Sequence, residues 1–176
     1  TGFQLEYIGG GLIGEIPLEI GNLANLTILS LVDNPLLTGP IPMHIGNLTH
    51  LNLNENSLTE RIPIALGRST DVESMTGMYN LTHLDLSGNL LTEDIPYEMW
   101  GLAALTHLDL SDNQLTGDVP PEIGNLNYLN RLHLNDNQFT GVKVGFNEIS
   151  GELEETICNL NITWGNLSNF NISNNK

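Results

Sequence analysis

Apolar and polar positions follow one short phrase along the chain, L-x-L-x-x-N-x-L, in which two leucines alternate with polar residues before an asparagine. Clear copies begin at Leu29, Leu51, Leu84, Leu108 and Leu132, and weaker copies begin at Leu5, Val142 and Phe170. Apolar residues at i and i+2 indicate a short strand with one buried face. A period of roughly 20 to 29 residues indicates stacked coils. The pattern therefore predicts short parallel strands repeated once per coil.

The asparagine of each copy stands where the chain leaves the strand. Its side-chain amide offers two donors and one acceptor, so it can bond backbone groups that a buried turn would otherwise leave unpaired. We expect these residues to form a structural ladder between coils: Asn34, Asn56, Asn89, Asn113, Asn137, Asn147 and Asn175.

A second phrase follows the asparagine and reads L-T-G-x-I-P, as at Leu37–Pro42 and Leu115–Pro120, and an I-G-N-L element comes next. Proline fixes φ and has no backbone N–H, so this part of the coil cannot be a central strand or a long helix. The phrase predicts a short extended piece and then a helical turn of the 3₁₀ type on the outer side.

Together these phrases resemble the plant-type leucine-rich repeat family, whose repeats read LxxLxLxxNxLTGxIPxxIGNL. The resemblance covers nearly the whole chain. It implies an α/β repeat solenoid: a curved leucine-rich repeat superhelix with a parallel concave β-sheet and short 3₁₀ or irregular convex arcs. Family members include receptor ectodomains and polygalacturonase-inhibitor-like proteins, and bacterial secreted proteins use similar repeats. The repeat is a scaffold, so it fixes function poorly.

Repeat spacing is irregular at two places within this single domain of about eight partial or complete repeats. Residues 68–77 (RSTDVESMTG) add length between Asn56 and Asn89 and are polar, so we expect an inserted surface loop. The distance from Asn137 to Asn147 is too short for a coil, which predicts missing residues or a distorted repeat at 141–142. The chain also begins and stops inside repeats, so we expect a longer mature protein or an assembly that covers its ends.

A formal net charge of −16 excludes nucleic acid and an anionic membrane surface as partners, since both need basic residues. One cysteine, Cys158, excludes an internal disulfide framework and a multi-cysteine metal site. The family resemblance implies a capping disulfide for Cys158, and a buried free thiol is the alternative. No catalytic or phosphate-binding motif stands out, so we expect no enzyme activity, no cofactor and no metal.

Outward positions of the predicted strands form a polar stripe on the concave face. We expect partner binding there, through His50, Asn52, His83, Asp85, His107, Asp109, Arg131 and His133. Two other interpretations remain open: a merely solvated sheet face, and a divalent-metal or pH-responsive patch around His83, Asp85, His107 and Asp109.

Two further sets of residues are candidates for modification or binding. Threonines of the L-T-G phrase could stack into a hydroxyl ladder that binds ice: Thr38, Thr59, Thr92, Thr116, Thr140 and Ser150. Six N-x-S/T triplets could carry glycans in a secreted protein: Asn25, Asn47, Asn80, Asn161, Asn166 and Asn171.

The sequence thus predicts a non-catalytic extracellular or cell-surface module that recognises a protein, peptide or glycan through its concave polar face. The alternative is a structural or surface-assembly protein, a fibre or coat unit that self-associates.

Overall fold

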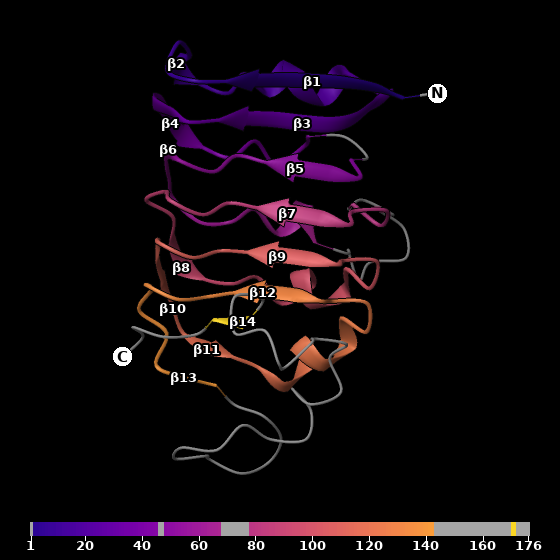
Figure 1. The fold of residues 1–176 in the computed structure, drawn as a ribbon, viewed down its shortest axis with the longest axis vertical. Coiled ribbons are helices and arrows are strands. Elements are labelled where there is room, and N and C mark those ends of the chain that lie inside the picture. The colour runs from indigo at the N-terminus through magenta and orange to yellow at the C-terminus, as the bar shows by residue number, and fades with distance from the viewer. Residues whose placement is uncertain (1, 46–47, 68–77, 143–169, 172–176) are drawn as a thin grey trace.

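The computed structural model describes residues 2–45, 48–67, 78–142 and 170–171. One parallel sheet runs along the whole stack, with a strand from each coil (Figure 1). Its strands, in spatial order, are β1 (Phe3–Ile8), β3 (Leu26–Val32), β5 (His50–Asn52), β7 (His83–Asp85), β9 (His107–Asp109), β12 (Arg131–His133) and β14 (Phe170–Asn171). We call the outward side of this sheet the strand face. It corresponds to the predicted concave face.

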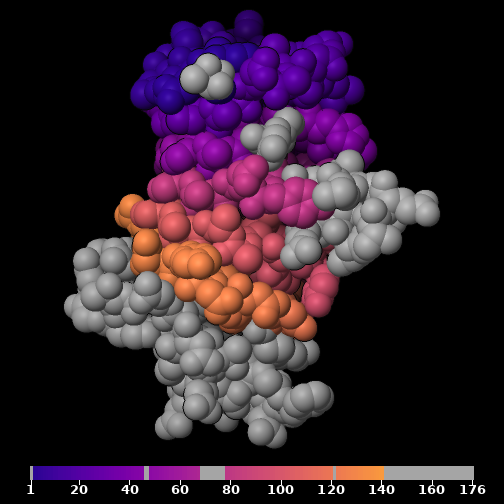
Figure 2. Space-filling view, turned by 90° about the vertical axis from the view of Figure 1, so that its right-hand side faces the viewer, coloured from indigo at the N-terminus to yellow at the C-terminus, as the bar shows by residue number. Residues whose placement is uncertain are grey.

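Smaller parallel sheets follow where each coil turns away from the strand face. They pair β2 (Ile13–Glu15), β4 (Asn34–Pro40) and β6 (Asn56–Thr59), then β8 (Thr92–Asp94) with β10 (Gln114–Thr116), and β11 (Asp118–Val119) with β13 (Gly141–Val142). Four 3₁₀ helices complete the described outer arcs: η1 (Leu18–Asn22), η2 (Ile64–Leu66), η3 (Tyr97–Gly101) and η4 (Pro121–Asn125). The predicted leucine-rich solenoid with 3₁₀ arcs is therefore confirmed. A space-filling view turned by 90° from Figure 1 also shows the coils stacked in chain order (Figure 2).

The core consists of columns of aliphatic side chains that run through the coils. Leu29, Leu51, Leu84 and Leu108 lie in register on neighbouring strands and are at most 1% exposed. Burying one leucine side chain is worth roughly 1.5–3 kcal/mol, so the repeated columns supply the main driving force for stacking. Trp100 of η3 joins this core and is 2% exposed.

Glycines of the outer arcs allow neighbouring coils to approach closely. A Cβ added to Gly21 would lie 2.2 Å from the His44 carbonyl oxygen, and one added to Gly67 would lie 2.3 Å from the Glu98 carbonyl carbon. Those atoms belong to the backbone of the next coil and cannot move aside. The packing distance of the outer arcs thus requires glycine at these two positions.

Five buried asparagines connect each coil to the one before it. Asn113 is typical: its Oδ1 accepts from the Leu91 N–H at 3.0 Å, and its Nδ2 lies 2.9 Å from the Leu86 carbonyl oxygen of the preceding coil. The same amide also donates to carbonyls of its own turn. Asn34, Asn56, Asn89 and Asn137 likewise bond a backbone N–H of an adjacent coil.

Two details of the sequence analysis are wrong. Val142 does not join the strand face: β13 pairs with β11, with Val142 opposite Val119, and the strand that follows β12 on the strand face is β14. Val142 therefore belongs to an edge strand of the coil, which the spacing of apolar residues alone did not distinguish from a new repeat.

The threonine ladder is the other error. Thr116 lies opposite Asp94, Thr59 opposite Pro40, and Thr38 opposite Ser57. A register shift between Asn34 and Thr38 moves the edge strands past one another, so the threonines do not stack as a flat array. Some of the hydroxyls bond acids instead, as Thr116 Oγ1 does with Asp94 Oδ1 at 2.8 Å.

Several predicted features fall outside the described residues: the inserted loop at 68–77, ladder residues Asn147 and Asn175, Ser150 and Cys158. The proposed discontinuity at 141–142 stays a prediction. In the part of the chain that the structure describes, no helix is long and apolar enough to cross a membrane.

We predict that Asn113→Ala destabilises the fold by about 3 kcal/mol, because the buried Leu91 N–H and several carbonyls lose their partner. Urea unfolding followed by circular dichroism measures this loss. Asn127→Ala is the matched control: that exposed side chain bonds only the nearby Asn125 carbonyl, so its removal should cost about 0.5 kcal/mol or less. Equal losses in the two variants would contradict a structural role for the ladder.

Candidate functional site

Three histidines form a stack in the middle of the strand face. His50 lies opposite His83 and His83 opposite His107, one on each of β5, β7 and β9. The ring centroids of each neighbouring pair are 4.3 Å apart and the rings are inclined by 14°. Parallel strands in register bring identical positions together, so the spacing of the strands sets the spacing of the rings.

A threonine holds each ring from the preceding position. Thr82 Oγ1 lies 3.0 Å from the Thr49 carbonyl oxygen and 2.9 Å from His83 Nδ1. A hydroxyl has one hydrogen, so Oγ1 accepts from an Nδ1–H when it donates to the carbonyl, and it donates to an unprotonated Nδ1 otherwise. Thr49 and Thr106 repeat both contacts with His50 and His107. When the hydroxyls donate to the carbonyls, the neutral rings carry their proton on Nδ1 and leave Nε2 unprotonated.

Two aspartates occupy the next outward position, and their carboxylates are engaged within the strand exits. Asp85 Oδ1 accepts from the Ser87 N–H at 3.1 Å and from its hydroxyl at 2.6 Å, while Oδ2 accepts from Asn54 Nδ2 at 2.9 Å. Asp109 repeats the two bonds with Ser111. Asp109 Oδ2 instead takes a 2.8 Å bond from His133 Nδ1, an ion pair when the imidazole is protonated.

These columns line a shallow groove of about 210 Å³ that crosses four strands. Its walls are His50, Leu51, Asn52, His83, Leu84, Asp85, His107, Leu108, Asp109 and Arg131. Seven of the eight predicted partner-binding residues therefore lie together around one depression. The eighth, His133, is not among the lining residues but bonds Asp109.

Burial and mutual repulsion oppose protonation of the stack. Partial burial lowers the pKa of His83 below its ordinary value, and the charges of His107 and His50 lower it further. For His107, burial again lowers the pKa most, followed by the charges of Arg131 and His50. Both effects penalise the charged form, because it loses water and meets like charge.

Sequence reasoning missed the threonines that position the rings. The signal was present as a repeated tripeptide, T-H-L, at Thr49–Leu51, Thr82–Leu84 and Thr106–Leu108. Adjacent strand residues point to opposite faces, so the alternation of the strand does not indicate a contact between the threonine and the histidine. The short Oγ1–Nδ1 contact arises at the strand start, where the threonine side chain bonds the preceding coil.

Acids at the strand exits have a backbone role. Asp33, Glu55, Asp112 and Asp136 directly precede ladder asparagines and adopt φ between 53 and 58°, a left-handed conformation. Burial raises the pKa of the Asp112 carboxyl, as do the charges of Asp136 and Asp109. In the described ranges, no group of three or more histidine, cysteine or acidic side chains is arranged to hold a metal ion.

Two of the predicted glycosylation residues, Asn25 and Asn80, are exposed. Asn47, Asn161 and Asn166 lie outside the described residues, and for Asn171 only the backbone strand is described.

Family models described as "Leucine rich repeat" match residues 68–115, and residues 25–48 and 47–69. Together they cover residues 25–115, more than half of the 176 residues. No curated protein sequence gives a significant match to the chain.

Solved structures of plant receptors are similar to this chain. PEPR1 with AtPEP1 is 28% identical with a TM-score of 0.69, over 93% of this chain and 23% of that one. The ectodomain of the Arabidopsis thaliana receptor kinase GASSHO1/SCHENGEN3, in complex with CASPARIAN STRIP INTEGRITY FACTOR 2, is 26% identical with a TM-score of 0.62, over 98% and 24%.

The plant peptide hormone receptor RGFR1, in complex with RGF2, is 27% identical with a TM-score of 0.58, over 96% of this chain and 27% of that one. The chain thus spans about a quarter of the length of these three receptors. From its repeats, its stacked coils and these matches, the chain belongs to the leucine-rich repeat family and is of the plant type.

Proposed function

We propose that this chain is a non-catalytic, extracellular ligand-binding module that recognises a peptide or protein through its strand face. The observation that carries the proposal is the groove across β5, β7, β9 and β12, where the outward polar side chains of four repeats converge. Binding sites are typically such depressions, with apolar walls and a few placed polar groups.

The similar structures support a partner of this class. PEPR1, GASSHO1/SCHENGEN3 and RGFR1 are each described together with another molecule. RGFR1 is named as a plant peptide hormone receptor in complex with RGF2. GASSHO1/SCHENGEN3 is named as a plant membrane receptor kinase and RGFR1 as a plant peptide hormone receptor, which supports a cell-surface location for this chain. On this reading the exposed Asn25 and Asn80 are candidate glycan acceptors.

Internal hydrogen bonds hold the strand face in one arrangement, which suits a binding surface. The Asp85 and Asp109 carboxylates accept from serines of their own strand exits, and the threonines beside the histidines bond backbone carbonyls of the preceding coil. A surface that is already arranged loses less conformational entropy when a ligand binds.

We predict that a bulky side chain in the groove weakens peptide binding regardless of the charge of the peptide. Twelve-residue peptides would be selected from a displayed random library on the wild-type chain. Their affinities would then be measured for Asn52→Trp, which places an indole among the lining residues. We expect at least a tenfold loss, about 1.4 kcal/mol, for most of the selected peptides.

Gln114→Trp is the matched control, because Gln114 is an exposed strand residue of β10 and does not line the groove. Circular dichroism spectra of both variants would establish that they fold like the wild type. If the selected peptides bind Asn52→Trp as well as they bind the wild type, the strand face is not the binding site.

A further inference from the structure

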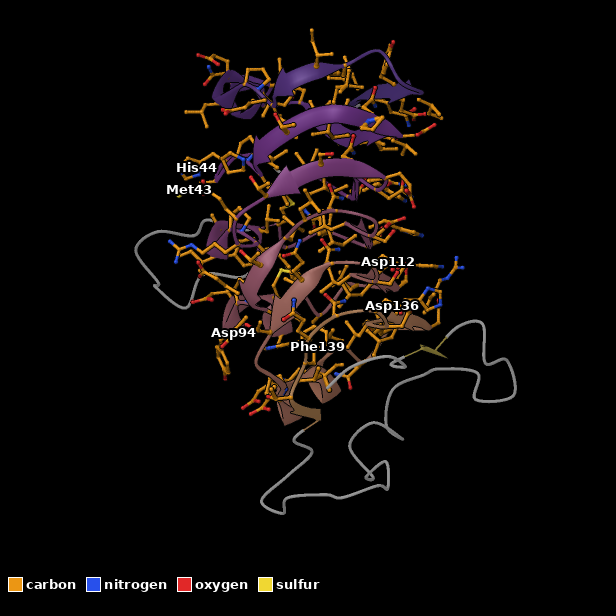
Figure 3. The ribbon with its side chains drawn as sticks, turned by 90° about the vertical axis from the view of Figure 1, so that its left-hand side faces the viewer. Met43, His44, Asp94, Asp112, Asp136 and Phe139 are labelled. Atoms are coloured by element: carbon orange, nitrogen blue, oxygen red, sulfur yellow. The ribbon has the colours of Figure 1, made fainter. Side chains whose placement is uncertain are left out.

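The groove contains a row of basic side chains in a chain that is otherwise strongly acidic. His50, His83 and His107 are followed in register by Arg131, which lies opposite His107 on β12. The chain has 5 Lys and Arg residues against 21 Asp and Glu residues, so such a row is not expected from composition. His44, the fifth histidine besides this row and His133, lies on the outer arc, on the side away from Asp112 and Asp136 (Figure 3).

The outward atoms of this row have no hydrogen-bond partner among the described residues. In His50, His83 and His107, Nδ1 is bonded to the preceding threonine, which leaves Nε2 as the ring nitrogen that can bond a ligand. Arg131 is exposed, and its guanidinium forms no hydrogen bond or ion pair with the described part of the chain. A protonated imidazole offers an Nε2–H in addition to its Nδ1–H. Protonation would therefore turn the row into a line of cationic donors that ends in a guanidinium.

The sign of the groove's charge depends on these histidines. With neutral imidazoles the lining carries the charge of Arg131 against those of Asp85 and Asp109. With all three imidazoles protonated, four positive groups face the same two carboxylates. On the remaining strands that face the row, β12 adds His133, which bonds Asp109, and β3 presents the uncharged Ile28 and Ser30. Acidification thus makes a net negative groove net positive.

The two aspartates compete weakly for these cations. Of the four carboxylate oxygens, the two Oδ1 atoms each accept two bonds from serine, and each Oδ2 accepts one. Three adjacent imidazolium rings at a 4.3 Å spacing therefore repel one another, and among the described residues none of them forms an ion pair with a carboxylate. Ligand carboxylates above the row would supply that counter-charge and form charge-assisted bonds with Nε2–H and the guanidinium.

We propose that this row binds an acidic segment of the peptide or protein partner, whose carboxylates lie across β5, β7, β9 and β12, and that binding takes up protons on the histidines. The inference rests on the proposed function and names the chemical class of its ligand. Four strands at about 4.8 Å spacing span about 14 Å, which matches four to five residues of an extended peptide. Affinity then rises as pH falls, because the protonated row is the binding-competent form.

Without ligand, the same row lowers stability in acid. A histidine whose pKa is lower in the folded chain than its unfolded value near 6.5 leaves stability unchanged above that value. Below about pH 6.5 the unfolded chain binds more protons than the folded chain, so the free energy of unfolding falls. We therefore expect the urea midpoint of the wild type to drop between pH 7.5 and 5.5.

In the double variant His83→Asn, His107→Asn, the side-chain amide can replace Nδ1 as the partner of the threonine, and the side chains at these two positions no longer titrate. The pH-dependent drop in midpoint should be smaller in this variant than in the wild type. His44→Asn is the matched control, since His44 is exposed on the outer arc. An equal drop in the double variant would contradict the cost assigned to charging the stack.

Binding is tested with fluorescein-labelled hexa-aspartate, with hexa-lysine and a Gly-Ser hexapeptide as comparison probes. Fluorescence anisotropy would be recorded with the full chain at pH 7.5 and 5.5 in 0.15 M salt, which screens charges beyond about 8 Å. We expect hexa-aspartate to bind at least tenfold more tightly at pH 5.5, and the Gly-Ser peptide to bind at neither pH. Isothermal titration in two buffers of different ionisation enthalpy should detect proton uptake.

Variants separate the row from the rest of the surface. The double histidine variant should lose the gain at low pH, and Arg131→Ala should weaken hexa-aspartate binding at both pH values. Arg61→Ala removes the same charge from an exposed site outside the groove and should change nothing. Preference for hexa-lysine, or a full pH gain in the double variant, overturns the inference.

The two proposals fail in different ways. If library peptides bind the wild type and lose affinity for Asn52→Trp while hexa-aspartate does not bind, the groove is the site but its ligand is not acidic. If hexa-aspartate binds equally well to Asn52→Trp, the acidic ligand does not occupy the groove and this inference fails. The proposed function fails only if the library peptides are also unaffected by that substitution.

Discussion

Every feature of this molecule depends on the bond that the buried asparagine makes to the coil before it. A coil that packed on its neighbour through leucines alone could slide, because dispersion and the hydrophobic effect have little directional preference. Asn89 Oδ1 accepts the Leu58 N–H at 3.0 Å, and Nδ2 reaches the Leu53 carbonyl oxygen at 2.9 Å. These bonds fix one coil relative to the next. Together with the backbone pairing of the strands, they hold the register of the strand face.

That register explains why the candidate site consists of columns. His50, His83 and His107 stack because each occupies the same place in its coil, and Asn52, Asp85 and Asp109 lie opposite one another for the same reason. The scaffold therefore multiplies whatever residue the repeat places at an outward position. A binding surface on this fold is built by choosing a few columns, while the interior stays constant.

The sequence predicts this fold well because its pattern reflects burial and turn chemistry, both local properties. In the five clear copies of the phrase, the first two leucines and the asparagine are buried as the repeat predicts, and seven of the eight predicted face residues line one groove. The edge strands were predicted less well. Their register depends on how each coil closes after its asparagine, and one shift after Asn34 moves Thr38 opposite Ser57.

The hydrogen bond between Thr82 and His83 could not be predicted from the sequence pattern either. It requires knowledge of the threonine rotamer and of the carbonyl on the preceding coil, neither of which residue spacing contains. Val142 was misplaced for a related reason: an apolar residue followed by another two positions later satisfies both the strand face and the edge strand. Periodicity identifies a buried strand but does not say which sheet receives it.

An in-register parallel sheet places like beside like, which is favourable for leucine and asparagine and unfavourable for ions. The acids of this chain illustrate how that cost is limited. In the column of residues with positive φ that precede the asparagines, Gly88 lies between Glu55 and Asp112 and separates their charges. On the strand face, Asn54 bonds the Asp85 carboxylate and His133 bonds the Asp109 carboxylate. Burial raises the pKa of the Asp112 carboxyl, and the neighbouring charges of Asp136 and Asp109 raise it further. The histidine stack follows the same rule in the opposite sense, since it is tolerated as neutral rings and strained as cations. Titration thus lets a fixed scaffold change the charge of its groove without moving a strand.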